Sequence, residues 1–217
     1  MTDTSQQTPA TGPLWRYVLQ DYQALYHAGS AGGSAPILQH MTSVAEALTL
    51  ILAERPEPAP TLEQVLPVAI HLKRALHGAE GFITSKLARS IALVAENLDW
   101  RYGYDDMPPG LEANFAFAEV VGPVGPIRHS AVKLGLVLFG PGTTYPTHSH
   151  AGITESYINI SGYMSENDTG VYAPGSLIFN PPDHQHQITT AKEEPCLLSY
   201  AWTGERSALE SHRAHFS

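Results

Sequence analysis

The 217-residue chain has a single cysteine, Cys196, and no cluster of lysine and arginine. One thiol excludes an intrachain disulfide and a thiolate metal cluster, and its apolar neighbours predict a buried strand residue. Acidic residues outnumber basic ones by 21 to 12, so the net charge is −9. This balance argues against nucleic acid or an anionic membrane as the main partner, and it suits a cationic small molecule.

The sequence also lacks an apolar run that approaches the length needed to cross a bilayer. Its first residues do not show the basic-then-apolar pattern of a signal peptide. We therefore expect a cytoplasmic protein with no membrane partner. The hydrophobic fraction of 43% and the length are sufficient for a full globular core.

The composition changes twice along the chain. Residues 1–12 are mostly small and polar, and we expect a disordered lead. From 13 to 100 the apolar residues are spaced as in helices. We expect helices from about 14 to 26, 38 to 53, 61 to 70 and 79 to 98, the last with Phe82 and Ile83 turned inward. This region is interpreted as a scaffold or dimerisation layer, so a homodimer is possible.

Residues 101–217 have the pattern of a β domain. Short apolar or alternating runs are separated by clusters of Gly, Pro, Asn and Asp, which is typical of an all-β sandwich or barrel. The expected strands are 115–121, 131–139, 156–160, 175–179, 185–190 and 196–202.

Histidines and one glutamate in this β region stand at a spacing that can close around one divalent metal. His148 and His150 are two residues apart, so on a strand their side chains leave the same face. Glu155 follows an Ala-Gly turn that can bring the next strand back beside the first. A third imidazole comes from His184 or His186, which follow a Pro-Pro-Asp turn. Three His and one Glu suit Zn, Fe(II), Mn, Co or Ni, and suit soft, sulfur-seeking metals poorly.

The remaining histidines, among them His40, are interpreted as ordinary surface or core residues.

Aromatic residues surround this motif. Tyr157 is two residues after Glu155, so on a strand it would point into the same cavity. A nearby divalent cation stabilises the ionised phenol and lowers its pKa, which makes Tyr157 a candidate base. Tyr145 could project from the mouth of the cavity. Three further aromatic side chains could hold a cation by attraction to the ring face: Tyr163, Tyr200 and Trp202.

The spacing of the metal motif resembles a known signature. Gly142, five residues, His-x-His, four residues, Glu, six residues and Gly162 match the first signature of the cupin superfamily at every fixed position. The resemblance implies a mainly β fold with α-helices. Its C-terminal part would be a cupin domain at 101–217, a double-stranded β-helix or jelly-roll barrel, preceded by the N-terminal helical region.

The second cupin signature is matched with two departures. Asp183 stands where the family has glycine, and Thr190 where it has asparagine. The first departure leaves open whether His184 or His186 is the metal ligand. We choose His186, because it matches the family position and lies in the extended run 185–190, where a strand would hold it rigidly.

The resemblance narrows to the cupin-type dimethylsulfoniopropionate lyases. It is carried by the metal motif with Tyr145 and Tyr157, and by Tyr200-Ala-Trp202 near the end of the β domain. The helical half and the run 100–104 are similar to that family as well. The family cleaves a small zwitterion, dimethylsulfoniopropionate, to dimethyl sulfide, acrylate and a proton.

The resemblance also implies roles for individual residues. One divalent transition metal, Zn, Fe, Mn, Co or Ni, would bind the substrate carboxylate. Tyr157, or alternatively Tyr145, would remove the α-proton. Trp202 and the nearby tyrosines would surround the sulfonium. The metal ligands would be His148, His150, Glu155 and His186.

Three other functions fit parts of the pattern. A cupin Fe(II) dioxygenase would use the same ligands and consume O₂. A regulatory cupin that binds a small molecule would be expected to carry a DNA-binding domain, yet the helical half is not basic. A sugar isomerase or epimerase would need more lysine and arginine around the cavity.

Overall fold

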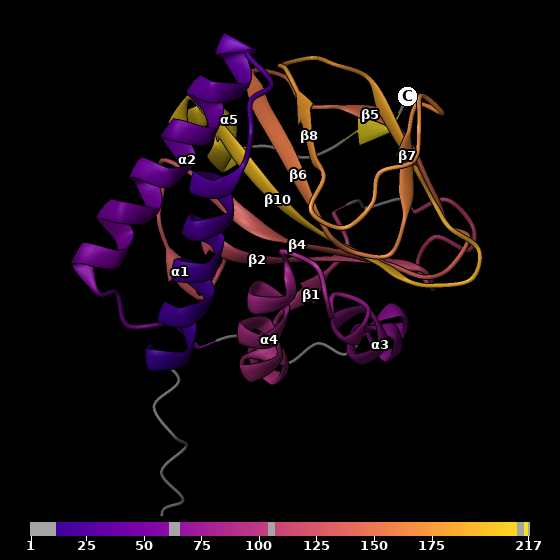
Figure 1. Ribbon diagram of the computed structural model, residues 1–217, viewed down its shortest axis with the longest axis horizontal. Helices are drawn as coiled ribbons and strands as arrows, with labels where there is room; N and C mark the ends of the chain where they lie inside the picture. The colour runs from indigo at the N-terminus through magenta and orange to yellow at the C-terminus, as the bar shows by residue number, and fades with distance from the viewer. Residues whose placement is uncertain (1–11, 61–65, 104–106, 212–214, 217) are drawn as a thin grey trace, which may run out of the picture.

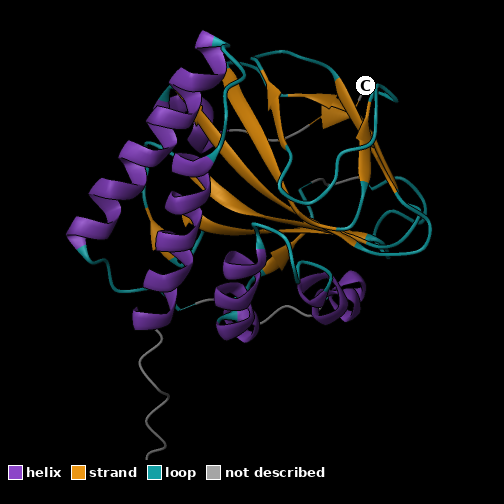
Figure 2. Cartoon of the chain, viewed as in Figure 1, coloured by secondary structure: helices purple, strands orange, loops and turns teal. Residues whose placement is uncertain are grey.

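The structure is a computed structural model that describes residues 12–60, 66–103, 107–211 and 215–216. Helices occupy the first part of the chain and strands the second (Figures 1 and 2). The expected lead at 1–12 lies almost wholly outside the described residues. Cys196 is buried in a strand, as its neighbours predict.

The first two expected helices are confirmed. Helix α1 spans Gly12–Ala28, and α2 spans Ala35–Glu54. A proline in the first turn of α2 fits there, because that position needs no N–H donor. Arg55 then ends α2 in the left-handed conformation. The side chains that α1 buries recur at helical spacing: Trp15, Val18, Leu19, Tyr22, Leu25 and Tyr26.

The third and fourth helices differ from expectation. The helix start expected at residue 61 lies outside the described residues, and the visible segment is a 3-10 turn, Pro67–His71, followed by α3, Leu72–His77. Residues 78–84 form turns, with Gly81 at φ +83°, so α4 covers only Ser85–Leu93. Phe82 and Ile83 therefore do not face inward; they are 38% and 63% exposed. A short 3-10 turn, Ala95–Asn97, follows α4.

Helix α2 is long and apolar enough, by length and composition alone, to cross a membrane. The expectation that no run approaches this length is therefore wrong. Core helices of soluble proteins meet the same criteria, and one face of α2 packs into the core with α1 and the sheet. That buried face consists of His40, Met41, Val44, Ala45, Leu48 and Ile51.

The strands form two largely antiparallel sheets. The larger has the order β1-β2-β4-β10-β6-β8, with β3 pairing parallel to β2. Its strands are Trp100–Arg101, Phe115–Gly122, Lys133–Phe139, Cys196–Gly204, Ile153–Ser161, Leu177–Asn180 and, for β3, Ile127–Arg128.

The smaller sheet has the order β11-β5-β9-β7. Its strands are His215–Phe216, Thr144–Ser149, His186–Thr190 and Met164–Glu166. All six expected strands are present. Within the described ranges no strand of one sheet pairs with a strand of the other, so of the two expected forms, sandwich or barrel, the β domain is an open sandwich of two sheets.

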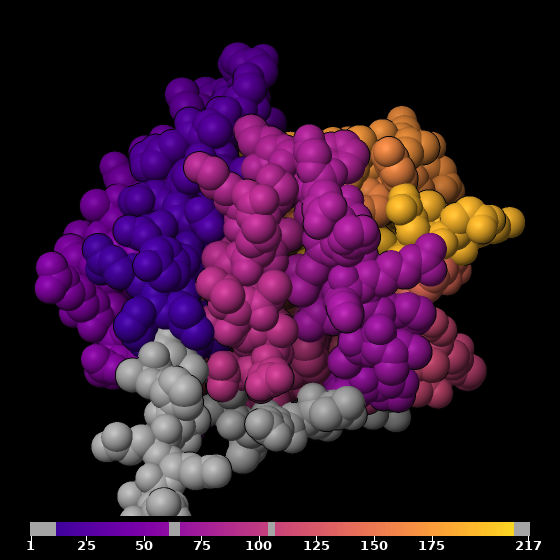
Figure 3. Space-filling view, turned by 60° about the horizontal axis from the view of Figure 1, so that its bottom comes forward, coloured from indigo at the N-terminus to yellow at the C-terminus, as the bar shows by residue number. Residues whose placement is uncertain are grey.

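The helices cover the outer face of the larger sheet (Figure 1). In the space-filling view, the helical segments before residue 100 form a continuous surface over this side (Figure 3). A short helix, α5, Arg206–Ser211, follows the last long strand. One apolar cluster joins the helices to the outer face of the larger sheet, and a second fills the space between the sheets. The domain boundary at residue 100 and the homodimer stay predictions.

Candidate active site

Strand β6 directs Glu155 and Tyr157 into the space between the sheets. The two residues are two apart, so the alternation of a strand places both on the inner face, while Ser156 between them faces the helices. Glu155 is 1% exposed and Tyr157 is 4% exposed. The structure thus arranges the pair as their spacing predicts.

Three histidines meet in the same space. His148 of β5 and His186 of β9 are partners in the strand register, and their ring centroids are 4.1 Å apart. His150 follows β5, with its ring 5.0 Å from that of His148 and 5.5 Å from that of His186. All three are buried, and one nitrogen of each lies within 4.8 Å of the others. Three buried histidines in this arrangement can hold a metal ion.

Backbone carbonyls orient two of these rings. His148 Nδ1 lies 2.9 Å from the carbonyl oxygen of Pro146, and His186 Nδ1 lies 3.1 Å from that of His184. Because a carbonyl oxygen only accepts, each Nδ1 carries a proton and donates it. The lone pair is therefore on Nε2 in both rings, as a metal-binding histidine with a fixed tautomer requires.

Glu155 lies at the centre of the polar contacts. Its Oε2 is 3.1 Å from His186 Nε2, and its Oε1 is 3.5 Å from His150 Nε2. The Trp202 indole N–H donates to Oε1 over 2.6 Å, and the Asn180 amide donates to Oε2 over 3.4 Å. Trp202 and Asn180 are the register partners of Glu155 on β10 and β8, so strand pairing itself supplies both donors.

The charge states of these groups suit a divalent cation. Burial raises the pKa of Glu155, but His150 and His186 outweigh it, so the pKa lies well below the usual value. Burial, followed by the charge of His186, lowers the pKa of His148 to about 3. For His186 burial lowers the pKa, but Glu155 prevails and raises it. An imidazole lone pair beside a carboxylate is repulsive unless a proton or a cation lies between them. One anionic oxygen donor and three nitrogen donors therefore fit a borderline metal such as zinc.

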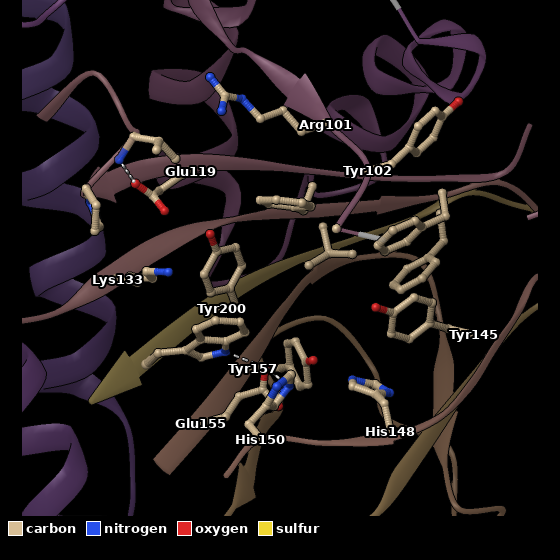
Figure 4. A pocket seen from close by; sticks show the side chains of 18 of the residues that line it. Arg101, Tyr102, Glu119, Lys133, Tyr145, His148, His150, Glu155, Tyr157 and Tyr200 are labelled. Atoms are coloured by element: carbon tan, nitrogen blue, oxygen red, sulfur yellow. Dashed lines mark hydrogen bonds and ion pairs between the residues drawn. The ribbon is translucent and has the colours of Figure 1, made fainter. Parts of the chain in front are cut away.

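The site opens into a cavity of about 420 Å³ with aromatic walls (Figure 4). Tyr145 stacks on Phe115, with ring centroids 4.5 Å apart, and meets His148 edge-on at 4.6 Å. The hydroxyl groups of Tyr145 and Tyr157 both point into the cavity in Figure 4. Tyr200 and Trp202 line the cavity with their ring centroids 5.4 Å apart.

Tyr163, expected as a substrate contact, lies elsewhere. It follows the turn at Gly162, is 41% exposed, and does not line the cavity. The turn at Gly162 directs it outward, because the strand alternation that holds Tyr157 inside ends there. His184 is also exposed, and it contributes its backbone carbonyl to His186 instead of its ring. The geometry therefore favours His186 over His184 as the third histidine.

The two departures from the second cupin signature have structural explanations. Asp183 adopts φ +64°, a left-handed conformation that glycine takes readily and aspartate tolerates. Its N–H donates to the carbonyl of His150 over 3.1 Å, which ties this turn to the metal motif. The Thr190 hydroxyl accepts the N–H of Thr143 at 2.9 Å and lies 3.1 Å from the Gly140 carbonyl, so it fastens β9 to the turn before β5.

Some contacts within the site, and two residues that line the cavity, could not be found from the sequence. The contacts of Trp202 and Asn180 with Glu155 depend on the register of three strands that are distant in sequence. Glu119 of β2 and Lys133 of β4 also line the cavity, and nothing in their local sequence singles them out.

Comparison with known proteins identifies the family. The profile of the dimethylsulfoniopropionate lyase family matches residues 39–198. The Cereibacter sphaeroides protein named "Putative dimethylsulfoniopropionate lyase DddL" is 47% identical over 197 residues, which are 91% of this chain and 85% of that protein. The chain belongs to the dimethylsulfoniopropionate lyase family. It is thus a member of a family of carbon–sulfur lyases, as the sequence resemblance predicted.

Solved structures agree on the fold. The crystal structure of the dimethylsulfoniopropionate lyase DddQ from Ruegeria pomeroyi DSS-3 aligns with a TM-score of 0.70 at 18% identity, over 94% of this chain and 96% of that one. A chain from a crystallographic study of the lyases RdDddP and RnDddQII aligns with a TM-score of 0.67 at 22% identity, over 94% and 98%. At these identities the likeness shows that the helical layer and the two sheets belong to one shared fold.

Proposed function

We propose that this protein cleaves dimethylsulfoniopropionate by a metal-dependent β-elimination in the cavity between its two sheets. The observation that carries the proposal is a buried four-donor set, three members of which line one cavity together with a buried tyrosine. His148, His150, His186 and Glu155 would hold the metal. When bound, a divalent cation supplies positive charge for the substrate carboxylate, on which charge builds as the α-proton leaves.

Tyr157 is the proposed base. Burial, and after it the charge of Glu155, raises the pKa of Tyr157 well above its usual value. Positive charge at the four-donor site acts in the opposite direction, so ionisation of the phenol depends on metal loading. The phenolate oxygen takes the α-proton, the C–H electron pair forms the C=C bond of acrylate, and the C–S pair leaves with sulfur as neutral dimethyl sulfide.

The cavity walls serve this reaction in two ways. Trp202 donates its indole N–H to Glu155 Oε1, and its ring lines the cavity beside the His150 ring, with centroids 4.6 Å apart. Tyr200 stands beside Trp202 and continues the wall. An aromatic, water-poor surround attracts the sulfonium and favours its conversion to an uncharged product.

Headspace gas chromatography of purified protein tests the proposal. We expect dimethyl sulfide release from dimethylsulfoniopropionate that EDTA abolishes and that one equivalent of a divalent transition metal restores. Release that survives complete metal removal would reject the metal role. Absence of dimethyl sulfide together with O₂ consumption on a thiol or diketone would favour a cupin dioxygenase, and ligand binding with neither reaction would favour a regulatory cupin.

A further inference from the structure

The cavity continues past the four-donor set to a second pair of charged residues, Glu119 and Lys133 (Figure 4). Glu119 is only 6% exposed. The Lys133 ammonium lies 5.4 Å from the centroid of the Trp202 ring. In the described part of the chain, neither residue is joined to a partner by an ion pair. Burial raises the pKa of the Glu119 carboxyl and outweighs the charges of Lys133 and Arg101, which act on it in the opposite direction. A further cation in the cavity would compensate a charge that is costly to bury.

Strand register places Glu119, at this end of the cavity, in line with Tyr157, the proposed base. Glu119 is the partner of Gly135, which is the partner of Tyr200, which in turn is the partner of Tyr157. A Cβ at Gly135 would lie 2.5 Å from the Tyr200 ring, so the missing side chain lets that ring lie across β4. Tyr200 therefore stands between Glu119 and Tyr157 on the inner face.

A second row of register partners lies beside the row from Glu119 to Tyr157. Lys133 is the partner of Trp202, and Trp202 is the partner of Glu155. Electrostatics agree with this layout: burial raises the pKa of Tyr200 well above its usual value, and the charges of Glu119 and Glu155 both add to the rise. The aromatic wall thus has a carboxylate at each end.

One oxygen of Glu119 is already engaged. Its Oε1 accepts the backbone N–H groups of Val124 and Gly125, each over 2.6 Å. Among the described residues both bonds go to Oε1, and Figure 4 shows the second oxygen on the side of Tyr200 and Lys133. This oxygen is available to a ligand in the cavity.

We propose that Glu119 supplies the counter-charge for the cationic end of a small zwitterion whose carboxylate is held at the four-donor site. This inference rests on the proposed function and deepens it: the cavity selects molecules that carry a carboxylate and a sulfonium or quaternary ammonium together. Tyr200 and Trp202 flank the cation between the two carboxylates. Lys133 balances Glu119 when the cavity holds no ligand.

A purely structural role for Glu119 is the competing explanation, because its carboxylate fastens the loop after β2. A Cβ at Gly122 would lie 2.5 Å from Glu119 Oε1, so the loop packs closely on this group. Glu119→Gln separates the two roles, since the amide oxygen can still accept both N–H groups while the charge is lost.

Calorimetric binding to metal-loaded protein tests the proposal with two ligands of matched shape. 3-(Trimethylammonio)propanoate carries a cation and a much poorer leaving group than a sulfonium, and 4,4-dimethylpentanoate replaces the charged nitrogen with carbon. We expect wild-type protein to prefer the cationic ligand. Glu119→Gln should reduce that preference at least about tenfold and keep the affinity for the neutral ligand within about twofold.

Glu210→Gln is the matched control. Glu210 also lines the cavity, but its side chain is 45% exposed and it pairs with Arg206 over 2.7 Å. Removing its charge should leave the preference unchanged. A preference that Glu119→Gln does not alter, or an equal loss of affinity for both ligands, would overturn the proposal.

The two proposals fail separately. If the wild-type protein releases no dimethyl sulfide and the preference still falls in Glu119→Gln, the lyase assignment fails and the cation subsite stands. If dimethyl sulfide is released and the preference does not move, only the subsite fails.

Discussion

The two faces of the larger sheet carry opposite chemistry, although the same strands build both. On β6, Glu155 and Tyr157 point into the cavity, while Ile158 and Ile160 pack against the helices. On β10, Tyr200 and Trp202 point inward, while Ala201 packs outward. The outer face is mostly aliphatic and packs against the helical layer, whereas the inner face carries the charged and phenolic groups.

One polar cluster interrupts the aliphatic outer face, and it lies behind the site. Ser156 Oγ is 2.9 Å from the Tyr26 hydroxyl and 2.9 Å from His40 Nε2, and His40 Nδ1 is 2.9 Å from the Thr203 hydroxyl. Ser156 separates Glu155 from Tyr157, and Thr203 follows Trp202. The helical layer therefore contacts the strands that hold the site through specific hydrogen bonds as well as apolar packing.

Loss of a metal ligand from the inner face should have the largest effect. His186→Ala removes a buried donor beside Glu155, so we expect loss of bound metal and a fall in dimethyl sulfide release of more than about a thousandfold. Elemental analysis and headspace assays measure the two effects. His184→Ala is the control, because its exposed ring only stacks on His186, with centroids 6.3 Å apart, and is not one of the four donors; metal loss in this variant would exchange the roles of the two histidines.

The two buried tyrosines of the inner face should differ by a smaller factor. Tyr157→Phe removes the proposed base and should lower kcat about a hundredfold or more with metal content unchanged. Tyr145→Phe keeps the stacking on Phe115 and should cost far less. Rates and metal content of both variants provide the measurement. A severe loss in Tyr145→Phe with near-normal Tyr157→Phe would move the base to Tyr145.

The inner face could be predicted from the sequence where ligand spacing is local. His148, His150, Glu155 and Tyr157 lie within ten residues; period-two alternation pairs the two histidines and pairs Glu155 with Tyr157, and the Ala-Gly turn between them brings the two pairs together. His186 required the family pattern, because the choice between it and His184 depends on a turn whose left-handed residue is an aspartate.

The outer face and the far end of the cavity could not be predicted in this way. His40 was interpreted as an ordinary histidine, since no local pattern shows that α2 places it across Ser156 and Thr203. Burial lowers its pKa to about 4, so it is neutral at neutral pH, and its contacts with two hydroxyl groups allow this because a hydroxyl group can either donate or accept. Glu119 and Tyr163 illustrate the same limit. Strand register brings Glu119 into the cavity, and the turn at Gly162 places Tyr163 outside it.

The smallest effect is expected from a hydrogen bond between the helical layer and the strand that holds the site. Two tyrosines one turn apart on α1 allow a matched test. The Tyr26 hydroxyl bonds to Ser156 on β6, and the Tyr22 hydroxyl donates to the Gly135 carbonyl on β4, a strand without a metal ligand. Each Tyr→Phe change removes one buried hydrogen bond and should cost about 1 kcal/mol in the free energy of unfolding. Only Tyr26→Phe should lower kcat, by about three- to tenfold, because it loosens the strand that positions Glu155 and Tyr157. Chemical denaturation and steady-state rates together decide the matter: equal kcat in the two variants would reduce the polar cluster to a purely stabilising role.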